Sequence, residues 1–180
     1  MKTPTLLVIS DTHGNVASLT SVLGWAKQRG IDALAFLGDG IADLSLAADR
    51  ADFHPPWKLV RGNGDWQTNV PLACTMEFAG HTFYLSHGHV SHVEEGLALL
   101  IAQAKAVNAE TALFGHTHVP FWDEIEGLLV LNPGSASRPR SSTGPSVATI
   151  ACPPDAWFIV HYWNIREGWL GEKTIREMTL

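Results

Sequence analysis

The segment TLLVISDTH, residues 5–13, joins an apolar run to a carboxylate and an imidazole. A short continuous apolar run of this composition is typical of a buried strand in a parallel sheet. The run 33–37 is followed in the same way by Gly38-Asp39, and the run 58–60 leads into Gly62-Asn63-Gly64-Asp65. Polar residues therefore come directly after each of the first three expected strands.

Helical patterns separate these strands. Asn15 is placed to cap a helix whose apolar residues recur at helical spacing as far as Ala26, and Gly30 supplies a stop. Residues 41–49 predict a short second helix. An alternation of strands and helices favours an α/β protein in which these strands run parallel.

The second part of the chain adds hairpins to this pattern. Residues 72–78 and 81–86 are joined by Ala79-Gly80, which predicts an antiparallel pair. Ser91 and Glu94 match a capping box, so we expect a long helix to begin at Ser91. The remaining expected strands are 111–114, a hairpin pair after it, 147–152 and 157–163. No repeat or linker interrupts the pattern, and we expect one mixed α/β domain over residues 1–180.

Composition and charge exclude several classes of protein. The chain has 180 residues, of which 46% are hydrophobic and 17% charged, and this excludes a disordered chain. Its net charge of −6 argues against nucleic acid as a partner, because sequence-independent binding needs basic patches. No apolar run approaches the roughly 20 residues of a membrane span. The apolar run that ends at Ser10 is too short for a signal peptide, so we expect a cytoplasmic protein with no membrane partner.

Histidines and carboxylates cluster at the ends of the expected strands. In α/β sheets the loops beyond the carboxyl ends of strands are where ligands usually bind. On an extended backbone, residues i and i+2 point the same way, so Asp11 with His13, and His116 with His118, can each reach a single site. The candidate ligands that these loops bring to one place are Asp11, His13, Asp39, Asn63, His87, His116 and His118.

Such a ligand set predicts a pair of divalent metal ions. It offers imidazole nitrogen with carboxylate or amide oxygen and no thiolate, which suits Mn, Fe, Zn or Ni. Seven ligands exceed what one catalytic metal uses, whereas two metals about 3.5–4 Å apart, bridged by one carboxylate, use them naturally. Two such cations outweigh the charges of Asp11, Asp39 and a hydroxide, and the net positive site favours an anion such as phosphate.

At this point the residues resemble the calcineurin-like metallophosphoesterases, and among them the small phosphodiesterases of the YfcE type. The motifs D-x-H, GD, GN-x-D, HG and GH-x-H occur here in that order, with Asn132-Pro133-Gly134-Ser135 after them. The resemblance covers roughly residues 5–140. It implies an α/β fold built as a four-layer α/β/β/α sandwich with two packed mixed β-sheets.

The resemblance also implies roles for the site residues. The first metal would be bound by Asp11, His13 and His118, and the second by Asn63, His87 and His116, with Asp39 bridging. Manganese is the expected metal, with nickel, iron and zinc as alternatives. The implied reaction is direct attack of a bridging hydroxide on phosphorus, with Asn63 and Asp39 as catalytic residues. The expected substrate contacts are Asn63, Gly64 and His89, and Asp65 is expected to orient its loop or a neighbouring histidine.

One position departs from the family pattern. Many phosphatases of the superfamily carry a histidine where this chain has Gly64. Without that general acid, which contributes roughly 10²–10⁴-fold, poor leaving groups should depart slowly. We therefore expect hydrolysis of a small phosphodiester, with activated aryl diesters preferred to alkyl monoesters. A phosphomonoesterase or nuclease of the same superfamily, and a non-catalytic scaffold of the Vps29 type, are the alternatives.

Three further residues could contact the substrate. Trp66 could stack on a nucleobase, although packing in the core is the favoured interpretation. Arg138 and Arg140 could neutralise a second phosphate, or they could be solvated loop charges. A homo-oligomer is a further possibility that the sequence leaves open.

Overall fold

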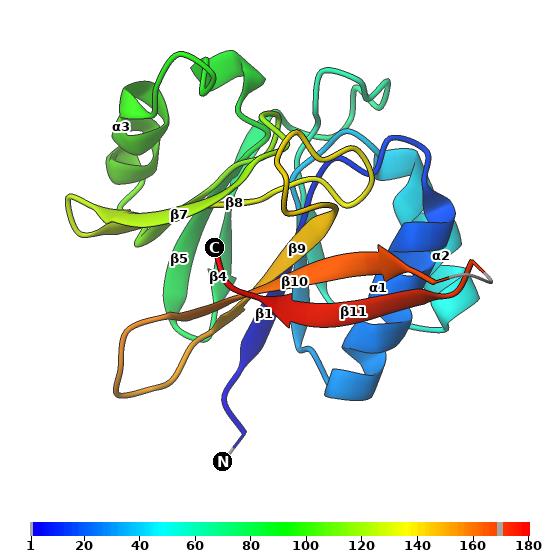
Figure 1. The fold of residues 1–180 in the computed structure, drawn as a ribbon. Coiled ribbons are helices and arrows are strands. Elements are labelled where there is room, and N and C mark those ends of the chain that lie inside the picture. Colours follow the sequence, from blue (N-terminus) through cyan, green and yellow to red (C-terminus); the bar gives the residue numbers. More distant parts are fainter. Residues whose placement is uncertain (1, 169–170) are drawn as a thin grey trace.

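Four layers make up the fold of this computed structural model, which describes residues 2–168 and 171–180. Two mixed β-sheets lie face to face, α1 and α2 cover the outer face of one, and α3 covers the outer face of the other (Figure 1). The helices are α1 (Val16–Arg29), α2 (Ile41–Ala51), α3 (Ala98–Ala106) and the short 3₁₀ helix η1 (His89–Ser91). This arrangement confirms the predicted α/β/β/α sandwich.

Each sheet combines parallel and antiparallel pairs of strands. The first sheet has the order β11-β10-β9-β1-β2-β3 and the second β4-β5-β6-β8-β7. The first sheet consists of β1 (Thr5–Ile9), β2 (Ala33–Phe36), β3 (Trp57–Leu59), β9 (Ser146–Ala151), β10 (Ile159–Glu167) and β11 (Lys173–Met178). The second consists of β4 (Ala73–Phe78), β5 (His81–Ser86), β6 (Thr111–Leu113), β7 (Pro120–Ile125) and β8 (Leu128–Pro133).

Alternation along β1 explains how one strand serves two hydrophobic cores. Leu6 and Val8 pack between the two sheets, whereas Leu7 and Ile9 pack against α1 and α2. Successive side chains of a strand point to opposite faces, so a strand that is covered on both faces is apolar throughout. A third core lies between α3 and the second sheet and includes Leu100.

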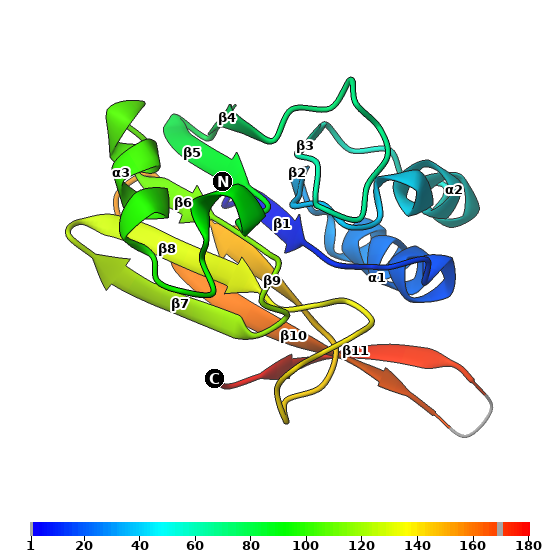
Figure 2. The ribbon, with the colours of Figure 1, turned by 90° about the horizontal axis from the view of Figure 1, so that it is seen from above.

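Parallel pairing brings the loops of interest to one edge of the molecule. β1 pairs parallel with β2, and β2 with β3, while β5 pairs parallel with β6, and β6 with β8. Seen from above, the two sheets lie between α1 and α2 on one side and α3 on the other (Figure 2). The carboxyl ends of the parallel strands within each sheet therefore share an edge.

The first helix forms as its sequence predicts. Asn15 accepts a hydrogen bond from the backbone N–H of Ser18 at 3.0 Å, which confirms the predicted N-cap. Gly30 ends the helix in the left-handed conformation, with φ of 65°.

The predicted helix start at Ser91 is wrong. η1 ends at Ser91, and α3 begins only at Ala98. Ser91 Oγ donates to Gln103 Oε1 at 2.7 Å, so this side chain ties the turn to α3 and is not an N-cap. Gly96 has φ of 156°, which no helix continues through. The capping-box pattern is present, but the tertiary contact and this backbone conformation decide the structure.

The strand β11 is one that the sequence analysis missed. It pairs antiparallel with β10 at the edge of the first sheet, and none of its residues is buried. Its charged residues are typical of an edge strand and leave no apolar run to detect. Within the described residues, no helix combines the length and apolar character needed to cross a membrane.

Candidate metal centre

Two buried carboxylates lie among three histidine rings at the shared edge of the sheets. Oδ1 of Asp11 lies 3.1 Å from Nε2 of His118, 3.6 Å from Nε2 of His13 and 4.0 Å from Nε2 of His87. The carboxylate of Asp39 lies 3.8 Å from Nε2 of His13 and 3.7 Å from Nε2 of His87. Loops from both sheets therefore contribute to one site.

These side chains form two overlapping groups that could hold metal ions. One group is Asp11, His13 and His118, and the other is Asp11, Asp39 and His87. Within each group the ligand atoms all lie within 4.8 Å of one another. Two groups that share a carboxylate have the arrangement that a dinuclear site requires.

Backbone carbonyls fix the orientation of two of the histidines. Nδ1 of His87 donates to the carbonyl of Leu37 at 2.6 Å, and Nδ1 of His118 donates to the carbonyl of Arg138 at 2.6 Å. A carbonyl can only accept, so Nδ1 of each ring carries a proton, and Nε2 is the ring nitrogen that faces the carboxylates. Histidines that bind metals are held in this way by a hydrogen bond from the other ring nitrogen.

Asp11 supplies the observation that tests whether a cation fits. Its side chain is fully buried, and Oδ1 lacks a hydrogen bond of normal geometry among the described residues. Burial raises the pKa of Asp11, but the contacts with His118 and His13 and the charge of His87 lower it, and the net pKa is well below its usual range. The contact with Asp11 in turn raises the pKa of His118 against the effect of burial. An ionised, buried carboxylate facing imidazole nitrogens is a donor set that divalent metals fit.

The backbone at the site is left-handed where the sequence analysis assumed an extended chain. The φ angles are 57° at Asp11, 44° at His13, 55° at Asp39, 66° at His116 and 61° at His118. The assumption that an extended backbone aligns each i and i+2 pair is therefore wrong. Such conformations cost about 1–3 kcal/mol each and persist only where the surroundings impose them.

Hydrogen bonds between neighbouring loops impose this conformation. The N–H of Asp11 donates to the carbonyl of Gly38, and that of His13 donates to the carbonyl of Asp39, both at 3.0 Å. The loops after β1 and β2 are thereby locked to each other. The paired side chains reach the same site because tertiary contacts turn the chain, which spacing alone could not show.

The loop after β3 carries Asn63 to the same place. Oδ1 of Asn63 lies 3.2 Å from Nε2 of His87. The N–H of Gly64 donates to Oδ1 of Asp39 at 2.7 Å. A Cβ atom at Gly62 would lie 2.1 Å from Oδ1 of Asp39, so only glycine allows this approach.

Asp65 anchors that loop through its carboxylate. Oδ2 accepts the N–H groups of Asp39 at 2.7 Å and Gly62 at 2.9 Å, and Oδ1 accepts those of Gly40 at 2.9 Å and Ile41 at 3.0 Å. One side chain thus joins the loops after β2 and β3. Its contacts are with backbone N–H groups and match the first of the two roles expected for it.

His116 and His89 lie beside the two groups. The ring centroid of His116 is 5.2 Å from that of His87, and its Nε2 faces Glu94 Oε2 at 3.6 Å. Nδ1 of His116 has no hydrogen-bond partner among the described residues. Burial and the charge of His87 lower the pKa of His116. His89 begins a 3₁₀ turn, yet its ring centroid is 5.3 Å from that of His87, and burial lowers its pKa.

Asn132 and Ser135 support the site in a way that the sequence analysis did not assign. Asn132 Nδ2 donates to the carbonyl of Gly115 at 2.8 Å and to Thr117 Oγ1 at 3.0 Å. Ser135 Oγ donates to the carbonyl of Asp11 at 2.7 Å. Asn132 is at the end of β8, which is parallel to β6, so the rule that found the other residues could have found it.

Asp43 has a similar supporting role from within α2. Its Oδ2 accepts Thr12 Oγ1 at 2.6 Å and the N–H of Gly14 at 2.9 Å. It lies in a helix and not after a strand, so the sequence carried no signal for it.

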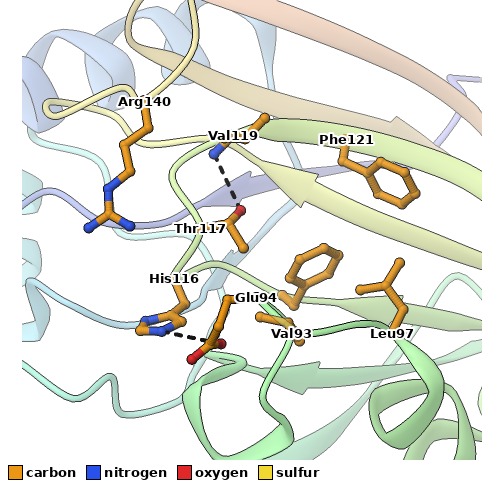
Figure 3. Close-up of a pocket in the computed structure, with 9 residues that line it drawn as sticks. Val93, Glu94, Leu97, His116, Thr117, Val119, Phe121 and Arg140 are labelled. Carbon is orange, nitrogen blue, oxygen red and sulfur yellow. Dashed lines mark hydrogen bonds and ion pairs between the residues drawn. The ribbon is translucent and has the colours of Figure 1, made fainter.

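Two cavities adjoin different histidines of the centre. The larger, of about 550 Å³, is lined by His116, Glu94, Thr117, Arg140, Val93, Leu97, Phe114, Val119 and Phe121. Figure 3 shows His116, Glu94 and Arg140 at one end of it and Leu97 and Phe121 at the other. The smaller, of about 290 Å³, is lined by His13, Asp39 and Gly64 together with Trp66 and Arg138, among others.

Trp66 corrects one expectation of the sequence analysis. Its side chain is 92% exposed, so the favoured interpretation as a core residue is wrong. It follows Asp65 directly, and the anchored loop leaves the interior at that point.

Comparison with known proteins identifies the family. Residues 5–153 match the family model of the calcineurin-like phosphoesterase superfamily domain. The chain therefore belongs to the calcineurin-like phosphoesterase superfamily. With its His/Asp cluster, it is of the metallophosphoesterase class.

Individual relatives align with most of the chain. The "Probable metallophosphoesterase YsnB" of Bacillus subtilis is 26% identical over 160 residues, which cover 87% of this chain and 89% of that protein. The "Phosphodiesterase YfcE" of Escherichia coli K12 is 26% identical over 162 residues, covering 78% and 84%.

Among solved structures, a predicted phosphoesterase of Streptococcus pneumoniae TIGR4 has a TM-score of 0.77 at 25% identity and covers 99% of both chains. Vps29 of Chaetomium thermophilum has a TM-score of 0.73 at 20% identity, covering 97% of this chain and 94% of that one, and so shares the fold.

Proposed function

We propose that this protein is a phosphodiesterase that uses two divalent metal ions. Asp11, His13 and His118 would hold one ion, and Asn63, His87 and His116 the other, with Asp39 between them. The observation that carries this proposal is the position of Asp11 and Asp39. Each carboxylate lies within about 4 Å of Nε2 atoms of histidines on two sides. Manganese is the metal we expect.

The residues of the chain divide the chemical work. Divalent ions at such a site lower the pKa of water and neutralise charge on phosphoryl oxygens. Asn63 has an amide oxygen directed at His87 and an NH₂ group free to donate to a phosphoryl oxygen. His118 and His87 keep their Nε2 atoms directed inward because their Nδ1 protons are held by carbonyls. Arg138 and Arg140 line the adjoining cavities and favour an anionic substrate.

Two features favour a diester over a monoester. Gly64 offers no side chain to protonate a leaving group, so the leaving group must be able to depart unaided. The cavities beside His116 and His13 share no lining residue, so each can hold one organic group of a diester. The relative YfcE is named a phosphodiesterase, which supports the same substrate class.

A scaffold without activity is the alternative that the fold allows, because Vps29 shares the architecture. The His/Asp groups favour the enzyme, since a protein-binding role gives no reason to bury an ionised Asp11 among imidazoles. Measuring the turnover of a phosphodiester distinguishes the enzyme from the scaffold.

The test compares bis-p-nitrophenyl phosphate with p-nitrophenyl phosphate after the chelated protein is reloaded with Mn²⁺ or Ni²⁺. We expect metal-dependent turnover of the diester, with the monoester slower. Asp39→Asn should abolish this turnover, because the carboxylate of Asp39 lies within 4 Å of Nε2 of both His13 and His87. Asp52→Asn is the matched control, since its carboxylate is exposed and pairs with Lys27. Preference for the monoester would contradict the diester assignment, and metal binding without any turnover would favour the scaffold.

A further inference from the structure

The indole of Trp66 is presented to solvent beside the metal centre. It is 92% exposed, whereas most of the other tryptophans are at least half covered. Among the described residues, no hydrogen bond, ion pair or ring contact engages it. A ring that is almost fully exposed buries little apolar surface in the folded chain, so it contributes little to stability.

The backbone that carries Trp66 is held in place. The preceding residue, Asp65, accepts four backbone N–H bonds that tie this loop to the loop after β2. Trp66 therefore has an anchored base and a free side chain. A binding platform needs this combination, because an anchored base limits the entropy lost when a ligand is bound.

Trp66 is also one wall of the smaller cavity. The cavity extends from His13 and Asp39 of the metal centre to Trp66, Gln67 and Arg138, and its volume is about 290 Å³. Pockets for drug-sized ligands span roughly 300–1,000 Å³, so this one is suited to a single ring system. Because the cavity begins at His13 and Asp39 of the metal centre, a ring bound in it would belong to an ester group of the phosphate at that centre.

Gln67 adds an independent polar signal. Gln67 lines this cavity, and its buried Oε1 has no hydrogen-bond partner among the described residues. A buried amide oxygen without a partner is costly, and a ligand with an N–H group would satisfy it. A plain phenyl ring carries no such donor, whereas nucleobases carry amino or imino N–H groups at their edges.

We propose that Trp66, Gln67 and Arg138 form a binding site for a nucleobase that belongs to one ester group of the phosphodiester. Trp66 stacks on the face of the base, Gln67 accepts a hydrogen bond from its edge, and Arg138 adds positive charge beside the phosphate. This inference rests on the proposed function and specifies its substrate as a small nucleotide diester. The net charge of −6 disfavours a nucleic-acid strand.

The test compares two diesters that share one leaving group. The p-nitrophenyl ester of a nucleoside 5′-monophosphate carries a base, and methyl p-nitrophenyl phosphate carries a methyl group in its place. The quantity measured is the ratio of their kcat/KM values with the Mn²⁺-loaded full chain. Stacking of one base contributes enough that its loss lowers binding about 5- to 140-fold. We expect Trp66→Ala to lower the ratio by that factor, chiefly through KM, and Trp66→Phe to retain most of it.

Trp157→Ala is the matched control. Trp157 is 47% exposed and lies beyond Ala151, which pairs with the first residue of β1, at the opposite end from Asp11. It should leave the ratio unchanged. Gln67→Leu should reduce the preference for the nucleoside ester less than Trp66→Ala does.

Direct binding separates this inference from the proposed function. Calorimetric titration of the same protein with a nucleoside 5′-monophosphate should give a Kd that Trp66→Ala raises and Trp157→Ala does not. If neither diester is hydrolysed but this difference in Kd is found, the base site stands and the proposed reaction fails. An unchanged ratio in Trp66→Ala, or an unchanged Kd where no turnover occurs, would overturn the base site.

Discussion

The carboxylate of Asp65 allows a demanding test of how the metal centre is held. Its two oxygens each accept two backbone N–H groups, from Asp39 and Gly62 at Oδ2 and from Gly40 and Ile41 at Oδ1. Asp65→Asn replaces one oxygen with an NH₂ group of almost the same size. Whichever way the amide is turned, its NH₂ faces two N–H donors, so two hydrogen bonds are lost and cannot be replaced within the loop.

The size of the effect follows from the type of bond. A hydrogen bond to a charged group contributes about 1.5–3 kcal/mol, so two lost bonds give an upper limit of about 3–6 kcal/mol. Asp65 is only partly buried, and water can reach part of the site. We therefore expect the free energy of unfolding to fall by about 2–4 kcal/mol, a large share of the roughly 5–15 kcal/mol of a typical domain.

Urea unfolding of the metal-free protein measures this change, and metal titration measures its consequence at the site. Loss of a hydrogen bond that orients metal ligands typically weakens metal binding about 10- to 100-fold. Asp52→Asn is the control, because that carboxylate is exposed and its residue is already in a left-handed conformation that asparagine tolerates. If Asp65→Asn unfolds at the wild-type urea concentration and binds metal normally, the anchoring role is refuted.

Three further predictions concern the same site. Because the pKa of His118 is raised, a metal must displace its proton. Metal affinity should therefore rise with pH by up to about tenfold per pH unit up to that pKa and then level off. Calorimetry in buffers of different ionisation enthalpy would show no proton release if this is incorrect. Gly62→Ala would place a Cβ atom 2.1 Å from Oδ1 of Asp39 and should destabilise the fold by about 1–3 kcal/mol. In the same unfolding assay, Gly24→Ala should stabilise the fold by about 0.5–1 kcal/mol, because a Cβ atom at this position of α1 meets nothing within 4 Å. Gly64→His should speed the hydrolysis of diesters with poor leaving groups, because it supplies a general acid. If the rate depends on the pKa of the leaving group as it does in the wild type, the absence of a histidine at position 64 does not limit the reaction.

The positions of the site residues could be predicted because burial leaves a clear pattern in the sequence. A strand that is covered on both faces is apolar throughout, so β1 and the polar residues after it stand out. Parallel strands bring their carboxyl ends together, and this rule is enough to place Asp11, Asp39 and His87 in one region from the amino-acid sequence alone. Their assignment to particular metal ions remains a prediction.

The conformation of the loops could not be predicted in the same way. The left-handed backbone at Asp11 and His13 depends on hydrogen bonds to Gly38 and Asp39, which are distant in sequence. Periodicity reports which face of an element is buried and carries no information on such turns. The exposure of Trp66 escaped prediction for a related reason, since an aromatic residue in a loop is compatible with packing and with binding.

The start of α3 shows how a local signal can be overruled. Ser91 and Glu94 have the spacing of a capping box, but Ser91 bonds to Gln103 and Gly96 breaks the helical path. The strand β11 was missed because its inward residues are few and its edge position favours charge. The error at β11 lies outside the loops that carry the ligands. The segment before α3 belongs to the loop that carries His87, and its Glu94 faces Nε2 of His116.

The most direct test of the two-metal proposal is a titration of the metal-free chain with Mn²⁺ in which bound metal and turnover of bis-p-nitrophenyl phosphate are measured in the same samples. We predict that turnover rises until two ions are bound per chain and then stays constant, and that Asp39→Asn shows no such rise. Full turnover at one bound ion, or turnover that is independent of Mn²⁺, would contradict the account.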